Sequence, residues 1–76
     1  MSLRPQPARS VVKALSKLGF EIVRKHGSHF VLKHPDGRIT VVPVHANEDV
    51  GVGLLLKIMK DAKLERAELL KLLAEK

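Results

Sequence analysis

Two tight turns divide the middle of this 76-residue chain into three short segments, and they restrict its fold more than any other feature. One turn is predicted at His26-Gly27 and the other at His34-Pro35-Asp36-Gly37, because proline presets the backbone of a turn and glycine accepts a positive φ. The segments 20–25, 28–33 and 38–42 alternate apolar and polar residues, which is the period of a β-strand. Since strands joined by such short turns run antiparallel, the sequence predicts a three-stranded antiparallel meander.

Strand alternation also predicts the two faces of this sheet, because neighbouring side chains point to opposite sides. One face should be covered by helices and carries the larger apolar residues: Phe20, Ile22, Phe30, Leu32, Ile39 and Val41. The other face should stay open and basic, with Glu21, Val23, Lys25, His29, Val31, Lys33, Arg38 and Thr40.

Helices are predicted before and after the meander. Apolar residues from Val11 to Leu18 recur at helical spacing, and we expect Ser10 to cap this helix and Gly19 to end it. After a long loop over residues 43–52, helical spacing returns from Gly53 onward.

The order of these elements predicts an α+β fold, in which one or two C-terminal helices pack on one face of the sheet. The last helix is expected over residues 65–74. Residues 1–9 contain two prolines and are expected to form a flexible arm, and residues 10–76 to form a single domain.

Composition narrows the classes of function. Fourteen Lys and Arg against eight Asp and Glu give a formal charge of +6, which favours a polyanionic partner such as nucleic acid. The chain has no Trp or Tyr and only two Phe, which argues against modules that stack bases on exposed aromatics. Without cysteine it has no disulfide or thiolate site. No apolar run approaches the roughly 18 residues of a membrane span, so we expect a cytoplasmic protein with no membrane partner.

The strongest candidate for chemistry is the sequence His26-Gly27-Ser28-His29, where a strand begins. Glycine permits close approach of a phosphate chain, and an exposed histidine can move protons near neutral pH. Lys25, Lys33 and Arg38 would hold phosphate. From the residues alone, an exposed strand histidine that has no role is the favoured interpretation.

Two other kinds of site are not favoured. The four histidines are spaced by three, five and eleven residues, which does not match a zinc site, so we expect no metal and no cofactor. Ser28 and His29 are adjacent on a strand and point apart, so they are not expected to form a nucleophile–base pair.

Several segments, in this order, resemble the HicA family, the small RNA-cleaving toxins of HicA–HicB toxin–antitoxin pairs. They are Leu18-Gly19-Phe20, Arg24-Lys25-His26-Gly27-Ser28-His29, Lys33-His34-Pro35-Asp36-Gly37-Arg38, Val42-Pro43-Val44-His45 and Gly53-Leu54-Leu55-Leu56-Lys57-Ile58. The resemblance extends over about residues 10–72.

The resemblance implies a fold like that of double-stranded-RNA-binding domains, with cleavage of messenger RNA and no metal. It implies that His29 is the catalytic histidine and that a HicB-like antitoxin covers the RNA-binding face. We expect Lys25, Gly27, Ser28, Lys33 and Arg38 to contact RNA. His45 lies where the family also places a histidine. A non-catalytic RNA- or DNA-binding module, or a pure interaction protein, remain the alternatives.

Overall fold

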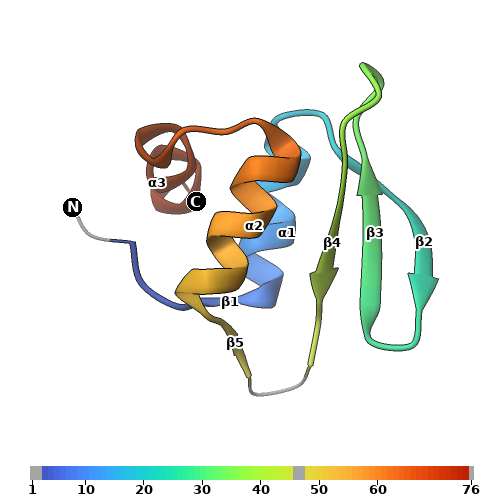
Figure 1. The fold of residues 1–76 in the computed structure, drawn as a ribbon, viewed down its shortest axis with the longest axis horizontal. Helices are drawn as coiled ribbons and strands as arrows, with labels where there is room; N and C mark the ends of the chain where they lie inside the picture. Colours follow the sequence, from blue (N-terminus) through green and yellow to red (C-terminus); the bar gives the residue numbers. More distant parts are fainter. Residues whose placement is uncertain (1–2, 46–47, 76) are drawn as a thin grey trace.

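The computed structural model describes residues 3–45 and 48–75 (Figure 1). The predicted arm and loop therefore have parts, residues 1–2 and 46–47, that lie outside the described residues, as does residue 76. The elements follow in this order: β1 (Gln6–Pro7), α1 (Ala8–Lys17), β2 (Glu21–His26), β3 (His29–Lys33), β4 (Ile39–Pro43), β5 (Asp49–Val50), α2 (Val52–Ala62) and α3 (Arg66–Ala74).

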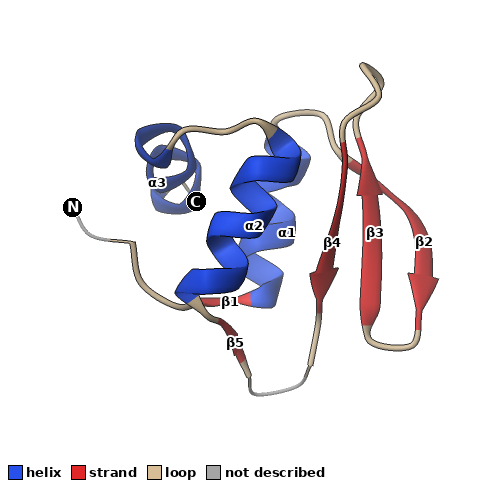
Figure 2. Cartoon of the chain, in the orientation of Figure 1, coloured by secondary structure: helices blue, strands red, loops and turns tan. Residues whose placement is uncertain are grey.

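The predicted meander is confirmed. Strands β2, β3 and β4 form a sheet in that order, and both neighbouring pairs are antiparallel (Figure 2). A second, two-stranded pairing joins β1 to β5. With a helix before the sheet and two helices after it, the chain has the predicted α+β fold. Among the described residues, no helix is long and apolar enough to cross a membrane.

The hydrophobic core lies between the helices and one face of the sheet. In Figure 1, α1 and α2 lie beside β4, and β2 forms the far edge of the sheet. Leu15 of α1, Leu55 and Ile58 of α2 and Leu32 of β3 are fully buried. Each such side chain contributes roughly 1.5–3 kcal/mol through its removal from water. The helices thus leave the opposite face of the sheet uncovered.

The prediction for the faces of β4 is wrong. Thr40 and Val42 are buried against the helices, whereas Ile39 and Val41 are 51% and 38% exposed. The register of the hairpin decides this, because Ile39 lies opposite Lys33 and therefore shares its open face. The hydroxyl of Thr40 is compatible with burial since it donates to Asp61 Oδ2 at 3.1 Å.

The prediction for β2 is only partly right, because a β-bulge interrupts its alternation between Ile22 and Arg24. An extra residue in one strand reverses the faces beyond it. Arg24 therefore lies opposite Val31 on the open face, and Lys25 lies opposite Phe30 on the other. The helices do not reach this edge strand, so Ile22 is 40% exposed although it lies on the helix side.

Helix α1 begins earlier than predicted. Its N-cap residue is Pro7 and no side chain caps it, so Ser10 is inside the helix. Residues 6–9, assigned to the arm, form β1 and the first turn of α1, and Ala8 is buried. The predicted end of the helix is confirmed: Gly19 has a φ of +105°, and the N–H of Phe20 donates to Leu15 O at 3.1 Å.

Candidate functional site

His29 is the first residue of β3 and its side chain is exposed on the open face of the sheet. Its neighbours across the strands are His26 in β2 and Pro43 in β4. Phe30 and Leu32 point the other way and pack into the core. The alternation of β3 therefore presents the His29 imidazole to solvent, as the sequence predicts.

The structure also brings His45 to His29. The centroids of the two rings are 6.1 Å apart, and their planes meet at 85°. The N–H of Val44 donates to the carbonyl of Ser28, which fixes the chain before His45 to the start of β3. Sequence reasoning placed His45 in a loop but missed this approach, because a loop has no period from which its path can be inferred. The signals for His45 were the histidine itself and its position, where the HicA family also places a histidine.

The turn between β2 and β3 has free space beside it. Gly27 has a φ of +63°, and a Cβ built on it would meet nothing within 4 Å. Ser28 is half-buried, and its carbonyl accepts the hydrogen bond from Val44. Glycine thus serves the turn here through its positive φ, and the turn has free space beside it.

The three predicted phosphate-binding cations do not lie together. Lys33 is exposed on the open face, at the end of β3 away from His29. Lys25 lies on the other face, with its Nζ 5.0 Å from the centroid of the Phe30 ring. Arg38 also turns away from the open face: its Nη1 donates to Ala62 O at 2.6 Å, and its Cζ lies 5.3 Å from the Phe20 ring centroid.

The open face is consequently less basic than predicted and more apolar. Arg24, which sequence alternation placed on the other side, and Lys33 line one shallow pocket of about 400 Å³ together with Val23, Val31 and Ile39. Val23, Ile39 and Val41 are the exposed large apolar residues of this surface, which we call the open face patch.

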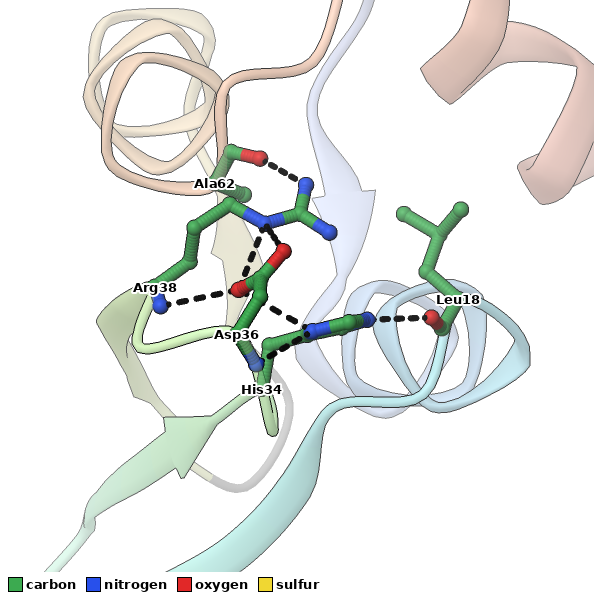
Figure 3. Close-up of polar contacts among 5 residues, drawn as sticks. All are labelled: Leu18, His34, Asp36, Arg38 and Ala62. Carbon is green, nitrogen blue, oxygen red and sulfur yellow. Dashed lines mark hydrogen bonds and ion pairs between the residues drawn. The ribbon is translucent and has the colours of Figure 1, made fainter.

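The segment His34-Pro35-Asp36-Gly37-Arg38 joins three elements rather than forming a reactive site (Figure 3). His34 Nε2 donates to Leu18 O at 2.9 Å, and its Nδ1 accepts from the Asp36 N–H at 3.1 Å. Asp36 Oδ2 in turn accepts from Arg38 Nε at 2.9 Å. Through Ala62 this network reaches the end of α2. Both nitrogens of His34 are used, so this imidazole holds the fold together.

The carboxyl group of Asp36 is the one whose ionisation the network changes most clearly. The backbone N–H of Arg38 donates to it, and the Arg38 guanidinium and His34 lie nearby. These contacts favour the charged form and lower the pKa of Asp36 below its ordinary value, although partial burial opposes them. Elsewhere in the part of the chain that the structure describes, no group of three or more His, Asp or Glu is arranged to hold a metal ion.

Comparison with known protein families gives one decisive match. The model of the family described as HicA toxin of bacterial toxin–antitoxin systems matches residues 8–64, three quarters of the chain. The chain belongs to the HicA toxin family. No curated protein sequence gives a significant match.

The part that matches the HicA model contains everything described above as a candidate site. It includes His29, His45 and the turn network around His34, and it ends at Leu64, before α3 begins at Arg66. Helix α3 thus lies outside the residues that the family model matches. It packs through the buried Leu69, and Lys17 Nζ of α1 donates to Leu72 O and Glu75 O near its C-terminal end.

Proposed function

We propose that this HicA toxin is an endoribonuclease that cleaves messenger RNA in the cytoplasm without a metal, with His29 as general acid/base. The observation that carries the proposal is the free imidazole of His29 on the open face. Within residues 3–45 and 48–75 this ring has no hydrogen-bond partner, in contrast to that of His34. An imidazole in this state can take a proton from a ribose 2′-hydroxyl and return one to the leaving oxygen.

The turn before His29 supports the approach of a phosphate chain. The free space beside Gly27 would admit RNA backbone close to the His29 ring. Ser28 would flank the same backbone. Because His29 begins a hydrogen-bonded strand, its Cα position is fixed before substrate binds, which reduces the entropy lost on reaching a reactive geometry.

For phosphate contacts we propose Lys33 on the open face and Lys25 at the edge strand, whose long side chains are exposed. The guanidinium of Arg38 is engaged by Asp36 and by Ala62 O, so its contribution to RNA binding would be indirect, through the shape of the β3–β4 turn. Arg24 lies on the open face, where strand alternation had placed Lys25, and we add it to the proposed contacts.

We further propose that a HicB-like antitoxin covers the open face. Family membership supports an antitoxin as partner. The open face patch supports its location, because Val23 and Ile39 are 56% and 51% exposed on a sheet with no covering layer. RNA bound through phosphates gains little from such residues, whereas a protein partner buries them favourably.

The test of the catalytic proposal compares His29→Ala with the wild type on a transcribed messenger RNA, with and without a chelator. We expect wild-type cleavage to persist in the chelator. The variant should cleave about 10²–10⁴-fold more slowly, the usual cost of losing a general acid or base. Its circular dichroism spectrum and its RNA affinity should stay close to those of the wild type.

His26→Ala is the matched control, because His26 is an exposed histidine directly across the hairpin from His29. We expect this control to keep most of the activity. A His29→Ala protein that cleaves at the wild-type rate would refute the catalytic role. Wild-type protein that binds RNA but leaves it intact would favour a non-catalytic binding module.

The partner proposal has a separate test. Ile39→Asp places a charge in the open face patch without touching the core, so the fold should be retained. We expect it to weaken the complex with a HicB-like antitoxin, measured by calorimetry. Leu56→Asp on α2, also exposed, is the control and should bind as the wild type does.

A further inference from the structure

His29 and His45 form the closest contact between two histidine rings among the described residues. They come from different elements: His29 from the start of β3, and His45 from the segment after β4. Both are exposed, and neither imidazole has a hydrogen-bond partner within the described parts of the chain. The Val44–Ser28 backbone hydrogen bond maintains their approach. Two exposed imidazoles are thus held side by side in edge-on contact on the surface.

Cleavage of RNA by transesterification needs two proton transfers around one phosphate. The 2′-hydroxyl loses a proton as its oxygen attacks phosphorus, and the 5′-oxygen gains a proton as the P–O5′ bond breaks. Each transfer needs a group within hydrogen-bond reach, about 2.6–3.2 Å from the oxygen concerned. One imidazole can serve both oxygens only by moving between them, whereas two imidazoles can serve them in the same step.

Building on the ribonuclease function above, we propose that His45 is a second catalytic histidine, which acts as the general acid while His29 acts as the general base. His29 accepts the 2′-hydroxyl proton as the new P–O2′ bond forms. Protonated His45 donates its proton to the 5′-oxygen as that oxygen leaves. The products are a 2′,3′-cyclic phosphate and a 5′-hydroxyl. The two rings end with exchanged protonation states, which proton exchange with water resets.

The surroundings of each ring support this division of roles. His45 lines a pocket of about 550 Å³ together with Arg9, Glu48 and Asp49. Arg9 can hold a phosphate group in this pocket, beside the His45 ring. His29 lies instead beside the open turn at Gly27, where the RNA backbone that carries the 2′-hydroxyl would approach. The leaving oxygen would then lie on the side of His45.

The experiment uses a leaving group that needs no proton. Wild-type protein first identifies a cleaved linkage in a transcribed RNA. An oligoribonucleotide with that linkage is then made with either oxygen or sulfur at the 5′ position of the scissile bond. We expect His45→Ala to cleave the oxygen substrate about 10²–10⁴-fold more slowly than the wild type. It should cleave the sulfur substrate at close to the wild-type rate, because a thiolate leaves without protonation.

His29→Ala should remain slow on both substrates, since the attack on phosphorus still needs a base. His26→Ala, the control, should show the wild-type ratio of the two rates. His45→Gln should behave as His45→Ala does, which excludes a folding defect as the cause. Two results would overturn the role of His45 as general acid. One is equal slowing of His45→Ala on both substrates, and the other is cleavage of the oxygen substrate by His45→Ala at the wild-type rate. A wild-type protein that cleaves no RNA would instead refute the ribonuclease function itself, and the pair with it.

Discussion

At the scale of single residues, the histidines divide into two groups. The ring of His34 is half-buried, uses both nitrogens and lies 5.2 Å edge-on from the Phe20 ring. The rings of His29 and His45 are exposed, and neither has a hydrogen-bond partner among the described residues. The residue type is the same, so the contacts made in the folded chain determine which histidines can take part in chemistry.

This contrast predicts different effects on stability. His34→Ala removes the hydrogen bonds to Leu18 and Asp36 and should lower the free energy of unfolding by about 1–3 kcal/mol. His26→Ala removes an exposed side chain and should change it by no more than about 0.5 kcal/mol. Urea unfolding followed by circular dichroism measures both. Equal midpoints for the two variants would contradict the structural role of His34.

Asp36 predicts a dependence of stability on pH. Its pKa is lowered in the folded chain, so its contribution is present above the ordinary aspartate pKa of about 3.9 and is lost as pH falls through the lower folded value. The stability difference between wild type and Asp36→Asn should therefore shrink as the solution is acidified below about pH 4. Thermal unfolding over this range provides the measurement. A difference that stays constant would show that ionisation of Asp36 contributes nothing.

At the scale of elements, the pairing register of β4 determines which of its side chains reach the core. Ile39 is larger than Thr40, yet Thr40 is 2% exposed and Ile39 is half exposed. The hairpin network of His34, Asp36 and Arg38 sets the register that produces this result. A turn can therefore override the preference of individual strand residues for the interior, provided that the buried hydroxyl finds a partner.

Two neighbouring valines in β4 test which of its side chains face the core. Val42 is fully buried, so Val42→Ala leaves a cavity and should cost about 1.5–3 kcal/mol of stability. Val41 is on the open face, so Val41→Ala should cost less than about 1 kcal/mol. Chemical denaturation of the two variants gives the comparison. The reverse order of costs would place the strand in the other register.

At the scale of the whole molecule, the helices of the described residues lie to one side of the sheet and leave its other face uncovered (Figure 1). The net charge of +6 would attract the proposed RNA substrate from a distance, but only some cations lie on this face. The same surface carries the open face patch, which suits a protein. Under the proposed function one face would serve RNA and an antitoxin in turn, and a bound antitoxin would exclude RNA from it.

This arrangement predicts a salt-dependent affinity for single-stranded RNA. The logarithm of the binding constant should fall linearly with the logarithm of salt concentration, because phosphate contacts release counterions. Lys33→Gln should make the slope shallower by about 0.7, the value for one contact with a single strand. Lys60→Gln on α2, away from the sheet face, is the control and should leave the slope unchanged. Fluorescence anisotropy across a salt series measures it.

The sequence by itself determined the elements that depend on neighbours along the chain. Three such features depend only on residues a few positions apart, so a local sequence pattern is enough to predict them. They are the alternation of residues 28–33, the turn at His34-Pro35-Asp36-Gly37 and the end of α1 at Gly19. They were sufficient for the meander, for the fold class and for the exposed position of His29. The family resemblance, read from motifs in the same order, led to the proposal that this histidine is catalytic.

Only the tertiary structure decided the features that depend on contacts between distant segments. Three features follow from pairing or packing with another part of the chain. They are the bulge in β2, the register of β4, and the start of α1 at Ala8, beside the β1–β5 pairing. The approach of His45 to His29 is of the same kind. Register and loop path minimise the free energy of the whole packed molecule, so no periodicity in one segment can specify them.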